Sequence, residues 1–115
     1  MSSHNFINYK EFENVDIRIG TVIEAYEYNE LKKPSIILKI DFGEKVGIKK
    51  TSAQLQKYYK GDELINKQVI AVVNFEPKQI GKIISEVLVL GLSDNNAEPV
   101  LISPDFKIEN GKKLY

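Results

Sequence analysis

The stretch DIRIGTVIEAY, residues 16–26, decides the fold class. Its side chains alternate with the period of a half-buried β-strand of about ten residues, and the odd-numbered positions from 17 to 25 are expected to face the core. Gly20 lies in the middle of this strand, where a glycine indicates a bulge or a bend. A first strand that curls in this way is what a small β-barrel requires.

Two further strands are predicted after a polar loop over residues 29–34. Residues 36–42 alternate with the same period, and the pair Gly43-Glu44 indicates a tight hairpin turn. A third strand is then expected over residues 45–49. Three lysines should point outward from this hairpin: Lys39, Lys45 and Lys49.

A short helix and two strands complete the predicted order. Thr51 or Ser52 is expected to cap a helix over residues 53–59, which Gly61 would end. Strands rich in Val and Ile follow over residues 67–75 and 85–92. Three strands, a short helix and two strands form the order of the five-stranded OB-fold barrel.

Segments at both ends extend this pattern. Asn8 and Glu11 form a capping-box pair at the start of an N-terminal helix. Residues 99–102 are expected to form a short edge strand, followed by a C-terminal extension. The prediction is therefore one all-β domain over residues 1–115, an OB-fold barrel with a short helix between strands 3 and 4, an N-terminal helix and a C-terminal extension.

The composition is that of a globular chain and excludes several kinds of site. The 115 residues are 43% hydrophobic and 28% charged, with no Cys and one His, at position 4. Disulfides, thiolate metal sites and His-based catalysis are therefore not expected. No phosphate-binding glycine-rich loop occurs, so we expect no cofactor, no metal and no enzymatic activity. No apolar run reaches membrane-span length and no signal peptide is recognisable, which predicts a cytoplasmic protein without membrane insertion.

The positive charge is concentrated in one part of the chain. The sequence has 16 basic and 16 acidic residues, and Arg18 is its only arginine. Residues 32–60 hold 8 lysines and 2 acids, a balance of +6. An OB fold binds ligands on strands 2 and 3 and in the loops after strands 1 and 4. These loops carry four further candidates: Lys32, Lys33, Lys78 and Lys82.

Five segments carry a resemblance to a known family. They are VDIRIG at 15–20, LKIDFGE at 38–44, KKTSAQL at 49–55, LINKQVIAVVNFEPKQI at 64–80 and SEVLVLG at 85–91. Together they resemble the tRNA-binding-domain family, in particular the stand-alone CsaA-type secretion chaperones. The resemblance spans about residues 12–115. It implies an OB fold, a homodimer joined through the terminal segments and the side of the barrel, and binding of unfolded or precursor polypeptides in apolar pockets with positive surroundings.

The loop of residues 74–86 departs from the tRNA-binding pattern in an informative way. Asn74, Pro77, Lys78 and the Ser85-Glu86 pair match the family. Three positions where basic residues are common hold other side chains instead: Glu76, Gln79 and Ile84. Phosphate contacts dominate nucleic-acid affinity, whereas apolar contact favours a peptide. We therefore expect tRNA binding to be weak and to vanish with salt.

The predicted peptide- or RNA-binding residues lie mainly in this loop. Asn74 could instead end strand 4 by bonding its own backbone, and Ser85 could instead cap a loop. Glu86 is either a ligand contact or an anchor of the loop. The apolar candidates are alternatively core residues. The set is Lys39, Lys49, Asn74, Phe75, Lys78, Ile80, Lys82, Ile84, Ser85, Glu86 and Leu88.

The terminal segments are predicted to form a two-fold interface. They carry too many apolar side chains for free chain ends. The predicted interface residues are Phe6, Ile7, Phe12, Phe106, Ile108 and Leu114.

The sequence therefore predicts an ATP-independent molecular chaperone of the CsaA type in protein secretion. Its partners would be unfolded or precursor polypeptides, with the translocation machinery as a further candidate. The alternative is a stand-alone tRNA-binding protein that acts through phosphate and shape contacts.

Overall fold

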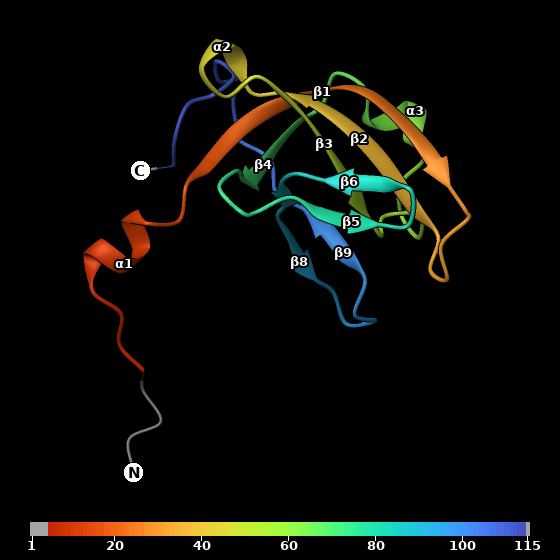
Figure 1. Ribbon diagram of the computed structural model, residues 1–115, viewed down its shortest axis with the longest axis horizontal. Helices are drawn as coiled ribbons and strands as arrows, with labels where there is room; N and C mark the ends of the chain where they lie inside the picture. The colour runs from red at the N-terminus through yellow and green to blue at the C-terminus, as the bar shows by residue number, and fades with distance from the viewer. Residues whose placement is uncertain (1–4, 115) are drawn as a thin grey trace.

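The computed structural model describes residues 5–114, which form a curled antiparallel sheet with short helices and two small hairpins (Figure 1). The main sheet has the strand order β3-β2-β1-β4-β7. Its strands are β1 (Ile17–Tyr28), β2 (Ser35–Asp41), β3 (Ile48–Ala53), β4 (Gln68–Val72) and β7 (Leu88–Val89). The predicted OB-like fold class is confirmed.

Hydrogen bonds join the two ends of this sheet. The Glu86 N–H donates to the Lys50 carbonyl at 2.8 Å, and the Thr51 hydroxyl donates to the Val87 carbonyl at 2.7 Å. The curled sheet therefore encloses one apolar core. Its buried members are Val22, Ile36, Leu38, Ile40, Phe42, Leu55, Leu64, Val69, Ala71 and Val87.

The predicted inward face of β1 is confirmed in part, because Ile17 and Ile19 are buried and Ala25 packs against the core, but the middle of the strand differs. Gly20 and Val22 lie on the core side, whereas Ile23 is 37% exposed. The bulge lies between Val22 and Glu24, not at Gly20. Gly20 is needed for another reason, because a Cβ at this position would lie 2.6 Å from Ile40 Cγ2.

The predicted tight turn after β2 is instead one turn of helix, α2 (Gly43–Val46). Gly43 and Gly47 bracket this turn with φ values of +86° and +87°, which glycine adopts without strain. The extra residues delay β3, which begins at Ile48 rather than at residue 45. The outward orientation predicted for Lys49 is wrong as a result. Lys49 pairs with the buried Ile40, and Lys50 takes the outer position opposite Lys39.

The helix between strands 3 and 4 lies later than predicted. Thr51 and Ser52 remain in β3, because the Thr51 hydroxyl is bonded to residues 85 and 87. The helix is α3 (Gly61–Leu64), so Gly61 begins it rather than ending it. Gly61 packs closely on β1, since a Cβ there would lie 3.1 Å from the Ala25 carbonyl oxygen.

The predicted strand over residues 85–92 is interrupted, and the loop before it is structured. Two-stranded hairpins form on either side of β7. They consist of β5 (Lys78–Ile80) with β6 (Ile83–Ser85), and of β8 (Gly91–Ser93) with β9 (Pro99–Leu101). The first hairpin turns at Gly81, whose φ of +60° suits a two-residue turn. The second contains the predicted edge strand.

The N-terminal and C-terminal segments differ in their position relative to the main sheet. The N-terminal helix α1 (Tyr9–Glu13) has the predicted capping box between Asn8 and Glu11, and it projects from the sheet (Figure 1). The C-terminal segment instead lies along β1. The Ile19 N–H donates to the Lys112 carbonyl, and the Leu114 N–H donates to the Ile17 carbonyl. Within residues 5–114 no helix is long and apolar enough to cross a membrane.

Candidate functional site

A pocket of about 730 Å³ lies on the outer side of β2 and β3. The loop after β1 forms one side of it, and the β5–β6 hairpin with the residues after it forms the other. Ser52 and Gln54 contribute from β3 and its end. Its lining is largely apolar. The residues are Leu31, Lys32, Lys33, Ser35, Ser52, Gln54, Phe75, Glu76, Lys78, Ile80, Ser85, Glu86, Val87 and Leu88.

The structure brings six of the predicted binding residues together in this pocket. They are Phe75, Lys78, Ile80, Ser85, Glu86 and Leu88. Phe75 is 56% exposed and Leu88 is 50% exposed, so both offer apolar surface outside the core. The other five predicted residues do not line the pocket: Lys39, Lys49, Asn74, Lys82 and Ile84.

The pairing of the β5–β6 hairpin explains why Ile80 and Ile84 separate. Ile80 pairs with Ile83, and Ile84 pairs with Gln79 in the middle of the hairpin. Successive side chains of a strand point to opposite faces. Ile80 therefore shares the face of Lys78 and lines the pocket, whereas Ile84 faces away and is 52% exposed.

Ser85 and Glu86 hold the hairpin to β3. The Ser85 and Thr51 hydroxyl oxygens are 2.8 Å apart, and a carboxylate oxygen of Glu86 accepts the Lys50 N–H at 2.9 Å. The Lys49 ammonium lies 4.0 Å from the second Glu86 oxygen. Glu86 is thus a loop anchor, and it also lines the pocket.

The tip of the hairpin closes one end of the pocket. A Cβ on Gly81 would lie 2.7 Å from Leu31 Cδ2, which shows how closely the tip approaches the loop after β1, and the φ of +60° at this position favours glycine. The Lys82 ammonium lies 3.9 Å from a Glu30 carboxylate oxygen. Both side chains of this pair are mostly exposed, so we expect it to contribute little stability.

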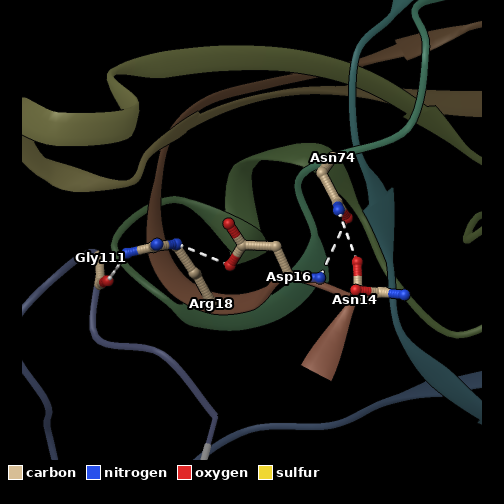
Figure 2. A network of polar contacts seen from close by, with 5 residues as sticks. All are labelled: Asn14, Asp16, Arg18, Asn74 and Gly111. Carbon is tan, nitrogen blue, oxygen red and sulfur yellow. Dashed lines mark hydrogen bonds and ion pairs between the residues drawn. The ribbon is translucent and has the colours of Figure 1, made fainter. Parts of the chain in front are cut away.

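Asn74 forms hydrogen bonds with the residues just before β1 (Figure 2), and it does not line the pocket. Its side-chain oxygen accepts the Asp16 N–H at 3.0 Å, and its amide nitrogen donates to the Asn14 carbonyl at 2.8 Å. Arg18 donates to Asp16 and to the Gly111 carbonyl, which extends the network to the C-terminal segment. Asn74 therefore fixes the point where the pocket-forming segment leaves β4.

Three lysines surround the pocket without an ion pair among residues 5–114: Lys32, Lys33 and Lys78. Lys39 differs, because its ammonium lies 3.0 Å from a Glu24 carboxylate oxygen. Two acids, Glu76 and Glu86, share the lining with the lysines. The pocket therefore offers an apolar wall with a rim of both signs of charge.

The described part of the chain shows no metal-binding cluster, and one tyrosine–aspartate pair has shifted pKa values. Residues 5–114 contain no cluster of three or more His, Cys, Asp or Glu that could hold a metal ion. The Tyr58 hydroxyl donates to Asp94, which raises the pKa of Tyr58 and lowers the pKa of Asp94. Neither residue lines the pocket.

Sequence reasoning missed the contributions from other segments. Leu31, Ser35, Ser52 and Gln54 line the pocket without having been predicted as binding residues. An apolar residue in the otherwise polar loop of residues 29–34 was the available signal for Leu31. The contributions from β2 and β3 depend on the strand register, which the displaced third strand obscured.

Comparison with known proteins supports the family resemblance. The model of a putative tRNA binding domain matches residues 17–113. Methionine–tRNA ligase of Pyrococcus furiosus is 32% identical over 109 residues, which is 95% of this chain and 14% of the ligase. The ligase of Nanoarchaeum equitans is 34% identical over 111 residues, again 14% of the enzyme. This chain thus spans about a seventh of the ligases that it matches.

Two solved structures match over their whole length. The chaperone CsaA from Bacillus anthracis is 43% identical with a TM-score of 0.90, and the CsaA chaperone protein from Picrophilus torridus is 48% identical with a TM-score of 0.88. Each match covers 96% of this chain and 100% of the other. Sequence motifs, fold and these similarities lead to one conclusion: the chain belongs to the tRNA-binding domain family.

Proposed function

We propose that this protein is an ATP-independent chaperone of the CsaA type, which binds unfolded or export-precursor polypeptides in the cytoplasm during protein secretion. The observation that carries this proposal is the apolar pocket with Phe75, Ile80 and Leu88 in its lining and lysines around it. The similarity to CsaA chaperones over the full length of those structures supports the same function.

The chemistry of the pocket suits an apolar side chain of a client. Fully burying one such side chain is worth about 1.5–3 kcal/mol, which permits reversible capture without an energy source. Lys32, Lys33 and Lys78 would attract acidic or disordered segments and speed their association. Translocation machinery would be a second partner, met when the client is handed over.

Titration of a fluorescently labelled unfolded polypeptide tests this function. The client is a disulfide-containing protein that has been unfolded by reduction and carboxymethylation. We expect this client to bind in the absence of nucleotide, with an affinity that ATP does not change. The same client protein in its native, disulfide-bonded state should not bind, because its apolar segments are buried. Equal binding of both states, or binding only with ATP, would contradict the proposal.

A second candidate function is tRNA binding. Lys39 and Lys50 are cross-strand neighbours on the outer side of β2 and β3, where phosphate groups could contact both. The match to the family model of a putative tRNA binding domain also favours tRNA binding. Zero net charge and a single arginine weaken it, because phosphate contacts supply most of the affinity for nucleic acid.

We also propose that the terminal segments join two copies of the chain. Phe106 is 78% exposed, Ile7 is 65% exposed, and none of the residues of α1 is buried. The other predicted interface residues are 38–89% exposed: Phe6, Phe12, Ile108 and Leu114. Pairing through a two-fold axis would cover this apolar surface.

Light scattering at micromolar concentration checks the dimer. We expect a mass about twice the chain mass of 13.1 kDa. Phe106→Ser should shift the mass toward that of one chain, whereas Ile84→Ser, which removes an exposed apolar side chain from the hairpin, should not. A wild-type mass of one chain would contradict the proposal.

A further inference from the structure

The pocket lining combines polar groups with large apolar side chains. The outer faces of β2 and β3 supply polar groups, among them Ser35, Ser52 and Gln54. The segment of residues 75–88 supplies the large apolar members of the lining, Phe75, Ile80 and Leu88, beside the charged Glu76, Lys78 and Glu86. A polypeptide in extended conformation has the matching chemistry, since its main chain is polar and its side chains project from it at alternate positions.

Gln54 stands apart from the other three glutamines of the chain. Gln56 donates to the Ser35 carbonyl at 2.7 Å, and Gln79 donates to the Gly81 carbonyl at 3.0 Å. Gln68 binds both main-chain groups of one residue, because it donates to the Ile108 carbonyl at 2.5 Å and accepts the Ile108 N–H at 3.0 Å. Within residues 5–114 the Gln54 amide has no hydrogen-bond partner.

We propose that Gln54 binds the main chain of the client polypeptide, as Gln68 binds the main chain of Ile108 within this protein. This inference rests on the proposed chaperone function. A side-chain amide offers both a donor and an acceptor, so it can pair with the N–H and the C=O of one client residue. The main chain is common to all clients, whereas the apolar wall selects for a side chain. Gln54 would therefore make binding tolerant of client sequence.

A nucleobase is the competing occupant for such an amide. Glutamine pairs in the same bidentate way with the edge of adenine. The surroundings of Gln54 favour a peptide because much of the pocket lining is apolar, with Phe75, Ile80 and Leu88 as its large members. Glu76 and Glu86 also offset part of the positive charge of Lys32, Lys33 and Lys78 that a phosphate chain would need.

The test combines a protein variant with a modified main chain. The probes are fluorescein-labelled synthetic peptides with one leucine in an alanine, serine and glutamate background, in which each peptide bond in turn is N-methylated. Gln54→Met keeps the length of the side chain and removes its amide. Gln79→Met is the control for the glutamine-to-methionine change, because Gln79 does not line the pocket, although it also loses its hydrogen bond to the Gly81 carbonyl.

For the wild type, we expect methylation at one or two bonds beside the leucine to weaken binding about 3–10-fold, the effect of a lost hydrogen bond. Gln54→Met should weaken binding of the unmodified peptide about as much, and the same methylation should then have no further effect. Gln79→Met should bind and respond like the wild type. Urea midpoints of all three proteins should agree, since both glutamines are exposed.

Three results would overturn the proposal. Peptide binding that depends on Ile80 but is unchanged by Gln54→Met would leave the pocket in place and remove the role of Gln54. Gln54→Met that weakens binding of an oligoadenylate and leaves peptide binding unchanged would assign the amide to a base. A wild-type protein that binds none of the peptides would overturn both this inference and the chaperone function.

Discussion

Phe42→Ala is expected to lower the free energy of unfolding by about 3–5 kcal/mol. Phe42 is fully buried at the end of β2, and its N–H donates to the Gly47 carbonyl at 3.0 Å. Its ring fills the space that Gly20 leaves open, since a Cβ on Gly20 would lie 2.7 Å from Phe42 Cδ1. Removing the ring leaves a cavity between two strands, and a loss of this size is a large part of the stability of a small domain.

Urea denaturation followed by circular dichroism measures this effect. Phe75→Ala makes the same chemical change at a position that is 56% exposed in the pocket lining. We expect this control to change stability by less than about 0.5 kcal/mol. Similar losses in the free energy of unfolding for the two variants would show that Phe42 is not the more deeply buried residue, which would contradict the described core.

Ile80→Ser is expected to weaken binding of an unfolded client by about 1–2 kcal/mol, a factor of roughly 5–30, at every salt concentration. The reason is that Ile80 lines the pocket and makes an apolar contact that salt does not screen. Lys78→Ala should instead slow association at low salt and matter little at high salt. Fluorescence anisotropy and stopped-flow mixing with a labelled polypeptide separate the two effects.

Ile84→Ser is the matched control for Ile80→Ser. It makes the same change in the same hairpin, on the face directed away from the pocket. We expect client affinity to stay within twofold of the wild type, and urea midpoints of both variants must show that the hairpin change does not unfold the barrel. Equal losses of affinity for both variants, or no loss for either, would place the binding groove elsewhere.

The strand order could be predicted from the sequence because periodicity is a local property. The alternation in residues 16–26 and 36–42 and the capping pair Asn8 and Glu11 all predicted the observed elements. The turn after β2 could not be predicted. A Cβ on Gly43 would lie 2.8 Å from the Asn110 carbonyl oxygen, so the C-terminal segment helps to set the form of this turn. The error in the third strand and in the orientation of Lys49 follows from it.

The same distinction between local sequence and contacts with distant segments applies to the candidate site. Phe75, Lys78 and Ile80 were found because they lie in one segment that carries the family motif. Gln54 was missed because it reaches the pocket from the segment directly after β3, which is distant in sequence from the segment of residues 74–88. Ile84 was placed in the pocket because the turn at Gly81, which sets the face of each hairpin residue, was not recognised.

Parallel titrations with a labelled export precursor and with labelled tRNA, over salt from about 0.02 to 0.5 M around the physiological value of about 0.15 M, test the central claim most directly. The chaperone function predicts that precursor binding persists across the series and is lost with Ile80→Ser. It also predicts that tRNA binding is weak at low salt and absent at physiological salt. Sub-micromolar tRNA binding that survives physiological salt, together with no precursor binding, would contradict this function and favour a tRNA-binding protein.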